Sequence, residues 1–252
     1  MSHPIYNLHN HTPFSDGAYM IDEICEAHVE CGTIAFDGVG IADNLFCTPS
    51  SREVQNERDF ERTFAAETRD YVETVHFARR EWSDKLHVFC GCEINWPLNK
   101  GHLDVIRTLL NGIDYVLFEH IDWAGLTQLA NQARRWPCPV GLSHTDVTRQ
   151  FPNTSMDQVV RTMANARIFY EMNTCMLPLT NHDRWFGTLP NHRVAVSLGT
   201  DTHDDLRCIR QVSDVVHYAE QHGLTEKFLL PKVRLDEVEV VAEKEKEKAP
   251  TA

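Results

Sequence analysis

The chain has 252 residues, 42% of them hydrophobic, and a formal net charge of −13 at pH 7. A chain of this length can bury a sizeable core, as one large domain or two small ones. The negative charge, which no local patch of Lys and Arg offsets, excludes nucleic acid as a main partner.

No apolar stretch approaches the roughly 20 residues of a membrane-spanning helix, and the N-terminal residues lack the features of a secretion signal. The eight cysteines form no CxxC pair and are interpreted as reduced core residues. We therefore expect a cytoplasmic protein that has no membrane partner. The oligomeric state stays open.

Short β-type runs alternate with segments of helical period along the chain. The first strand is expected at 5–11 and the first helix at 20–31, where Ile21, Ile24 and Cys25 share one face and Gly32 ends the helix. Later strands are expected at 36–43, 86–93, 115–120, 140–144, 168–173 and 194–201, and later helices at 59–82, 126–136, 156–166 and 206–222. About seven βα units predict an α/β fold with a closed or nearly closed parallel barrel; a doubly wound open sheet is the alternative.

Two segments fall outside this pattern. Residues 47–58 are polar and predict a plain surface loop, with a flexible flap over a site as the alternative. The tail at 236–252 is charged and low in complexity, so we expect a frayed helix or disorder there and a domain that spans 1–235.

Side chains that can bind metals end six of the predicted strands. They are His9, His11, Asp43, Asn44, Glu93, His120, His144, Asp201 and His203. Barrel enzymes place their active sites at these ends, and residues two apart in a strand project to the same side, so the pairs at 9/11 and 201/203 are suited to chelation. One histidine at a strand end is more often structural, but six such ends predict a metal site because crowded polar groups without a cation are costly to bury.

Mixed nitrogen and oxygen ligands suit Zn, Mn or Fe better than Ca. Two or more such ions would lower the pKa of a bridging water and neutralise a phosphoryl group under attack. We therefore expect two or more divalent metal ions that act on a phosphoryl group.

The motifs that hold these residues resemble those of the polymerase and histidinol phosphatase (PHP) family. In chain order they are LHNHTPFSDG at 8–17, GIADN at 40–44, GCEIN at 91–95, DYVLFEHID at 114–122, GLSHTDVTRQF at 141–151 and SLGTDTH at 197–203. Their order covers nearly the whole chain up to about residue 235. The resemblance implies a distorted, TIM-like (β/α)7 barrel in a single domain, with a metal cluster at its C-terminal rim.

The resemblance also implies which residues would bind each ion. His9, His11, Glu93 and Asp201 would hold the first metal, and Glu93, His120 and His144 would hold the second. Asp16, Asn44 and His203 would hold a third. Asn44 departs from the family pattern, in which a DH dipeptide supplies histidine, and an amide is the weaker ligand for zinc.

The segment HTDVTRQF is most similar to the histidinol phosphatase branch of the family. The resemblance thus implies hydrolysis of a small phosphomonoester by a metal-bridging hydroxide, with Asp201 and His203 in catalytic roles. Arg149 and Arg207 would hold the phosphate, although a surface arginine that pairs with nearby acids is an equal alternative for each. Two functions remain as rivals: a metal-dependent phosphodiesterase or amidohydrolase-like enzyme, and a non-catalytic metal-binding module.

Overall fold

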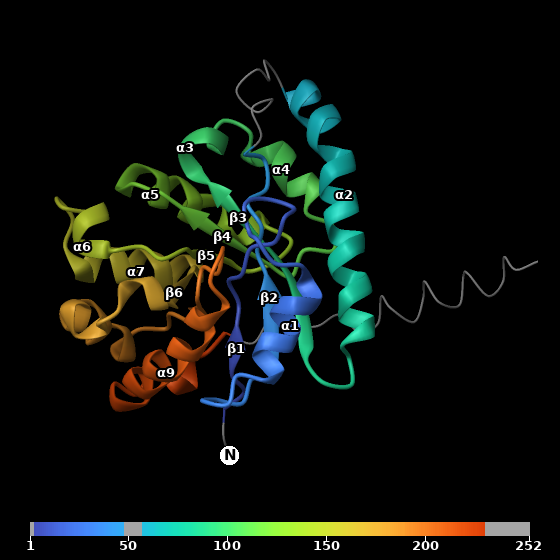
Figure 1. Ribbon diagram of the computed structural model, residues 1–252. Coiled ribbons are helices and arrows are strands. Elements are labelled where there is room, and N and C mark those ends of the chain that lie inside the picture. Colours follow the sequence, from blue (N-terminus) through green and yellow to red (C-terminus); the bar gives the residue numbers. More distant parts are fainter. Residues whose placement is uncertain (1–2, 48–56, 230–252) are drawn as a thin grey trace, which may run out of the picture.

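A closed barrel of seven parallel strands forms the centre of the molecule (Figure 1). The computed structural model describes residues 3–47 and 57–229. The strands pair in chain order, and β7 pairs with β1. They are β1 (Tyr6–Asn7), β2 (Gly38–Ile41), β3 (His87–Asn95), β4 (Tyr115–Glu119), β5 (Val140–Leu142), β6 (Phe169–Asn173) and β7 (Val196–Gly199). The predicted barrel is confirmed at all seven strands, and the alternative of an open sheet is wrong.

Helices surround this barrel (Figure 1). The α-helices are α1 (Ile21–Val29), α2 (Glu57–Glu81), α3 (Trp96–Asn99), α4 (Leu103–Leu109), α5 (Trp123–Gln132), α6 (Val147–Gln150), α7 (Met156–Ala166), α8 (Asp183–Phe186) and α9 (Val212–Gln221). Short 3₁₀ turns are η2 (Ala133–Arg135), η3 (Thr174–Met176), η4 (Leu179–His182), η5 (Leu189–Asn191), η6 (Leu206–Gln211) and η7 (Thr225–Lys227). The long helix α2 packs on β3 and α4, while α9 packs on β7.

Local capping decides where several helices begin. Helix α7 matches its predicted bounds because the Ser155 hydroxyl accepts a hydrogen bond from the N–H of Gln158. Helix α5 begins three residues before its predicted start, since the Asp122 side chain caps it by accepting from Gly125 N. Helices α3, α4, α6 and α8 were not predicted because four to seven residues are too few to show a helical period.

The barrel interior holds an aromatic core. Along β4, Tyr115 and Leu117 face inward while Val116 and Phe118 face the surrounding helices, as strand alternation requires. The inner cluster is Leu8, Ala42, Phe89, Tyr115, Leu117 and Phe169. Gly91 leaves room for it, since a Cβ there would lie 2.2 Å from the Tyr115 ring. The aromatic rings thus fill the barrel beneath the C-terminal ends of the strands.

Polar clamps tie helix α2 to the barrel. The buried Tyr71 hydroxyl lies 2.9 Å from the carbonyl oxygen of Ile41 and 2.7 Å from that of Gly91. At the other end of the strands, Arg79 donates to the carboxylate of Asp114, which also accepts from Cys90 N at 2.8 Å. These contacts satisfy backbone and charged groups that burial would otherwise leave unpaired.

A buried histidine ties helix α1 to β1. His28 Nδ1 donates to the carbonyl oxygen of Ile24 at 2.7 Å, and His28 Nε2 accepts from Asn7 Nδ2 at 2.8 Å. The Asn7 amide also donates to Thr200 Oγ1 at 2.9 Å, so the network reaches the end of β7. His28 therefore serves packing and hydrogen bonding.

The predicted surface loop and the predicted tail lie wholly or mostly outside the described residues. Residues 48–56 of the predicted loop at 47–58, and the whole predicted tail at 236–252, lie outside the described residues. Among the helices that the structure describes, none combines the length and the apolar character that crossing a bilayer requires; α2 is long enough but rich in charged side chains.

Candidate metal centre

Side chains from five strand ends meet at the C-terminal rim in three groups of candidate metal ligands. We call them the inner group (His9, His11, Glu93, Asp201), the outer group (His11, Asp16, His203) and the lateral group (Glu93, Glu119, His144). Within each group, one ligand atom from each residue lies within 4.8 Å of the others. Two residues are shared: His11 joins the inner and outer groups, and Glu93 joins the inner and lateral groups.

The inner group is the most compact. His9 Nε2 lies 2.9 Å from His11 Nε2, and Asp201 Oδ1 lies 3.4 Å from the first and 3.1 Å from the second. Glu93 Oε1 lies 3.5 Å from His9 Nε2. Four donor atoms that converge in this way surround a common point, which is the arrangement that a divalent cation requires.

Regular β1 pairing ends at Asn7, yet the two histidines after it still converge. Backbone hydrogen bonds continue the contact with the end of β7: His11 N donates to Thr202 O at 2.9 Å, and Asp201 N donates to His9 O at 3.0 Å. These bonds place His9, His11 and Asp201 side by side. The prediction that positions 9 and 11 face one point therefore agrees with the geometry, although the strand itself is shorter than predicted.

Three predicted ligands have left-handed backbone conformations. The φ angle is 56° at His120, which directly follows β4. It is 26° at His144, two residues after β5, and 52° at Asp201, two residues after β7. Such conformations cost about 1–3 kcal/mol for residues other than glycine and concentrate at functional sites. The chain thus retains strained backbone positions at the rim, and two of these residues, His144 and Asp201, belong to the ligand groups.

Charges in the inner group shift the pKa values of its members. Burial alone would lower the pKa of His9, but the charges of Glu171, Glu93 and Asp201 raise it well above its usual range. Burial alone would raise the pKa of Glu93 and of Asp201, but the neighbouring imidazoles lower both. The two carboxylates are therefore ionised at neutral pH, and their charge must be balanced by imidazole protons or by a cation.

The residues of the inner group fit a divalent ion on two observations. Asp201 Oδ1 is buried and accepts no hydrogen bond within the described residues, which leaves it available for coordination. His9 Nδ1 lies 2.7 Å from Glu171 Oε1. The carboxylate accepts a hydrogen bond from Nδ1–H, which leaves the lone pair of Nε2 free to bind a metal ion in the inner group. A set of two imidazoles and two carboxylates suits Zn, Mn or Fe.

The outer group is more open to solvent. Asp16 Oδ1 lies 3.4 Å from His11 Nδ1 and 3.3 Å from His203 Nε2, and the Asp16 side chain is 59% exposed. His203 Nδ1 donates to the carbonyl oxygen of Asp201 at 2.8 Å. In the structure His11 joins Asp16 and His203 in this group. Asn44, which the sequence placed with Asp16 and His203, pairs with Glu93 through the backbone, and its buried Oδ1 has no hydrogen-bond partner among the described residues, so its part in a third ligand set stays a prediction.

The lateral group differs from the predicted second ligand set in one residue. His144 Nε2 lies 3.3 Å from Glu93 Oε1. Burial would lower the pKa of His144, but its hydrogen bond to Glu93 raises it to about 9. The predicted third member, His120, has a side chain 59% exposed and lies outside the three groups, with its Nε2 2.9 Å from Glu119 Oε2.

Two glutamates of the site were missed in the sequence analysis. Glu119 belongs to the lateral group and Glu171 contacts both His9 and His144 N. The available signal was strand alternation, because Glu119 follows the inward-facing Tyr115 and Leu117 at intervals of two, and Glu171 follows Phe169. A charged residue within an apolar strand pattern faces either solvent or a polar site, and only the closed barrel shows which.

Asp43, which ends a predicted strand, has a structural role in this geometry. Its carboxylate is buried and accepts hydrogen bonds from Thr12 N at 2.7 Å, Thr12 Oγ1 at 2.8 Å and Ser15 Oγ at 2.6 Å. It thereby holds the segment after β1, which carries Asp16.

The two arginines predicted to hold phosphate are both exposed. Arg207 Nε and its terminal nitrogen donate to the two carboxylate oxygens of Asp205, each at 2.8 Å. Arg149 lies in α6, whose first turn is capped by Asp146. The pairing of Arg207 with a nearby acid corresponds to the alternative interpretation of that residue, and phosphate contact by either arginine stays a prediction.

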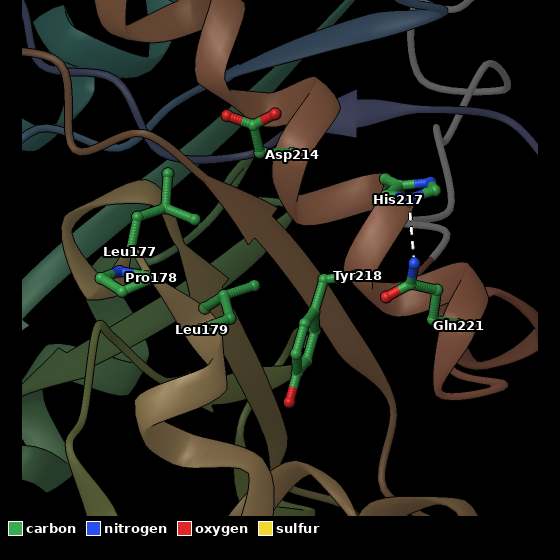
Figure 2. Close-up of a pocket in the computed structure, with 7 residues that line it drawn as sticks. All are labelled: Leu177, Pro178, Leu179, Asp214, His217, Tyr218 and Gln221. Atoms are coloured by element: carbon green, nitrogen blue, oxygen red, sulfur yellow. Dashed lines mark hydrogen bonds between the residues drawn. The ribbon is translucent and has the colours of Figure 1, made fainter.

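A pocket of about 460 Å³ lies elsewhere, between the segment after β6 and helix α9 (Figure 2). Its walls are Leu177, Pro178, Leu179, Asp214, His217, Tyr218 and Gln221. None of them belongs to the inner, outer or lateral group, and Figure 2 shows His217 bonded to Gln221. The pocket is therefore separate from the candidate metal centre.

Comparisons with known proteins bear on the fold. No family model and no curated protein sequence matches the chain. Among solved structures, the chain is similar to a histidinol phosphate phosphatase from Lactococcus lactis, complexed with zinc, L-histidinol and phosphate, at a TM-score of 0.58 and 15% identity over 87% of this chain and 94% of that one. It also matches a tryptophan synthase from M. tuberculosis at a TM-score of 0.44 and 11% identity, over 89% and 91% of the two chains. At 15% identity, the first of these likenesses establishes a shared barrel fold.

Proposed function

We propose that the chain is a metal-dependent phosphoesterase that hydrolyses a small-molecule phosphomonoester of the histidinol phosphate type. The observation that carries the proposal is the inner group, where two imidazoles and two ionised carboxylates converge. The Lactococcus lactis phosphatase, which shares the fold and is complexed with zinc and phosphate, supports this choice of reaction. The order of the PHP-like motifs along the chain gives separate support.

Two of the three groups would hold the metal ions. His9, His11, Glu93 and Asp201 would hold one ion, and Glu93, Glu119 and His144 a second, so that Glu93 joins the two. Bound divalent ions would supply an activated water at neutral pH and neutralise charge on the phosphoryl group. Zinc, manganese or iron are the candidates, because the donor set mixes nitrogen and oxygen.

The partly exposed and exposed residues near the metal groups would contact the substrate. His203 is 33% exposed, and its Nε2 faces Asp16 at the solvent side of the inner group. Its Nδ1–H is hydrogen-bonded to a carbonyl oxygen, which fixes the ring, so in the imidazolium form the second proton, on Nε2, can pass to the leaving oxygen of a phosphomonoester and leave a neutral imidazole. Arg149 and Arg207 would contact phosphate oxygens once the exposed pair of Arg207 with Asp205 opens, at low cost because such surface pairs are weak.

The test is phosphate release by purified protein loaded with zinc, manganese or iron. The panel contains L-histidinol phosphate, sugar phosphates, nucleotide monophosphates, a phosphodiester and an amide. We expect phosphomonoesters to be cleaved orders of magnitude faster than the diester and the amide. If protein that holds stoichiometric metal released no phosphate from any phosphomonoester, the proposal would be refuted. Faster cleavage of the diester or the amide would instead support one of the rival reactions.

A further inference from the structure

We propose that Glu171 is a positioning residue that orients the ligands of two metal ions at once. The inference rests on the metal-dependent part of the proposed function. Glu171 lies on β6, is completely buried, and belongs to none of the three ligand groups. It reaches the inner group through one carboxylate oxygen and the lateral group through the other.

The first contact is with His9. Glu171 Oε1 lies 2.7 Å from His9 Nδ1, on the side of the ring opposite to His11 and Asp201. Because an ionised carboxylate only accepts hydrogen bonds, Nδ1 carries the proton in this pair. The contact therefore fixes both the tautomer and the plane of the ring, and it directs the unprotonated Nε2 into the inner group.

The second contact is with the backbone of His144. Glu171 Oε2 accepts a hydrogen bond from His144 N at 2.6 Å. His144 has a left-handed backbone, with φ of 26°, and its Nε2 lies 3.3 Å from Glu93 in the lateral group. The hydrogen bond stabilises a conformation that the residue rarely adopts on its own. The rings of His9 and His144 are stacked, with centroids 5.8 Å apart, so one carboxylate serves both of them.

Gly199 leaves the space that the Glu171 carboxylate occupies, which independently supports the proposed role. A Cβ at position 199 would lie 1.9 Å from Glu171 Oε1 and 2.9 Å from the Cβ of His9. The residue sits in β7 opposite Asn173 of β6, where any side chain pointing inward would displace Glu171. The absence of a side chain there keeps the carboxylate in contact with both histidines.

The two contacts can be tested with a substitution that changes hydrogen bonding but not shape. Both partners of Glu171 are N–H donors, and a carboxylate has an acceptor for each. Glutamine has the same shape but only one acceptor oxygen, so its NH₂ must oppose either His9 Nδ1–H or the N–H of His144. Glu171→Gln should therefore disturb one ligand set with little change in volume.

The experiment measures binding of zinc and manganese to wild type and to Glu171→Gln by chelator competition, with ions per chain determined after dialysis. We expect affinity to fall about 10- to 100-fold, as is usual when an outer partner of a metal-bound histidine is lost. The matched control is Asp114→Asn, since Asp114 is also a buried carboxylate that accepts from a backbone N–H but lies at the opposite ends of the strands. The control should lose stability and retain wild-type affinity. Affinity of Glu171→Gln within about twofold of wild type would overturn the proposal.

A second measurement needs no variant of Glu171 and covers the case in which Glu171→Gln fails to fold. In zinc-loaded wild type with ¹⁵N-labelled histidine, NMR should show His9 protonated at Nδ1 and bound to the ion through Nε2. A proton on Nε2 of His9, or a wild-type chain that binds no ions, would overturn the proposal. Neither readout depends on catalysis, so a protein that binds ions but cleaves no phosphomonoester would refute the proposed reaction and leave the role of Glu171 standing.

Discussion

Acid should weaken the fold through His28, and His28→Gln should remove that sensitivity. The imidazole is buried between α1 and β1, where Nδ1 donates to Ile24 O and Nε2 accepts from Asn7. Burial lowers the pKa of His28 from 6.5 to about 4, against the opposing effect of its bond to Ile24. A proton on Nε2 would place a charge away from water and set one N–H donor against another. Glutamine keeps an acceptor for Asn7 and does not titrate in this range.

The size of the effect follows from the two pKa values. Between pH 6.5 and about 4 the unfolded chain binds more protons at this residue than the folded chain does, so the free energy of unfolding decreases as the pH falls. The contribution of His28 is complete above pH 6.5 and is lost toward pH 4, by about 3 kcal/mol in total and by about 2 kcal/mol at pH 5.

The assay is urea unfolding at pH 7.5 and pH 5.0 with a chelator present, so that metal binding does not contribute. The loss of unfolding free energy between these two pH values should be about 2 kcal/mol smaller in His28→Gln than in wild type. The control is His217→Gln on α9, where the imidazole is 70% exposed, and it should show the wild-type loss. Equal losses in wild type and His28→Gln would refute the assignment of acid sensitivity to this network.

Three further outcomes are expected. Tyr71→Phe removes the hydroxyl that binds the carbonyls of Ile41 and Gly91, and should lower the free energy of unfolding by about 1–3 kcal/mol in urea. Glu93→Gln affects the inner and lateral groups together, so the chain should hold fewer ions by elemental analysis and lose more than about 100-fold in phosphate release, with an unchanged circular dichroism spectrum. Zinc at about 100 times its dissociation constant should stabilise the chelator-treated wild type by about 2.7 kcal/mol, and no rise in the melting temperature would contradict a metal site.

The barrel could be predicted from sequence because its signals are local. Each strand is a short apolar run with a polar end, and four of the six connections between strands contain a segment with a helical period. Most strand bounds were overestimated, above all for β1, where pairing of residues 5–11 was expected and regular pairing stops at Asn7, whereas β3 extends two residues beyond its predicted end. Residues beyond that point keep their backbone bonds to the end of β7, which a single segment of sequence does not show.

The candidate site was only partly predictable, because its remaining members depend on contacts between distant strands. Glu171 is 162 residues from His9 along the chain, and the contact of their side chains follows from barrel closure alone. Glu119 was not predicted because the adjacent His120 fits the ligand motif better, yet the His120 side chain, in the left-handed turn after β4, is 59% exposed. Asn44 lies beside Glu93 through a backbone bridge, and its place in a third ligand set stays a prediction.

The unequal burial of the inner and outer groups has a consequence for how ions would enter and leave. His9, His11 and Glu93 are almost inaccessible, whereas Asp16 is largely exposed, and the two groups share His11. An ion held by the outer residues would exchange with the medium freely, while one held by the inner residues would have to leave past His11. A brief wash with a weak chelator would then separate a fast-exchanging population, held by the outer residues, from a slow one.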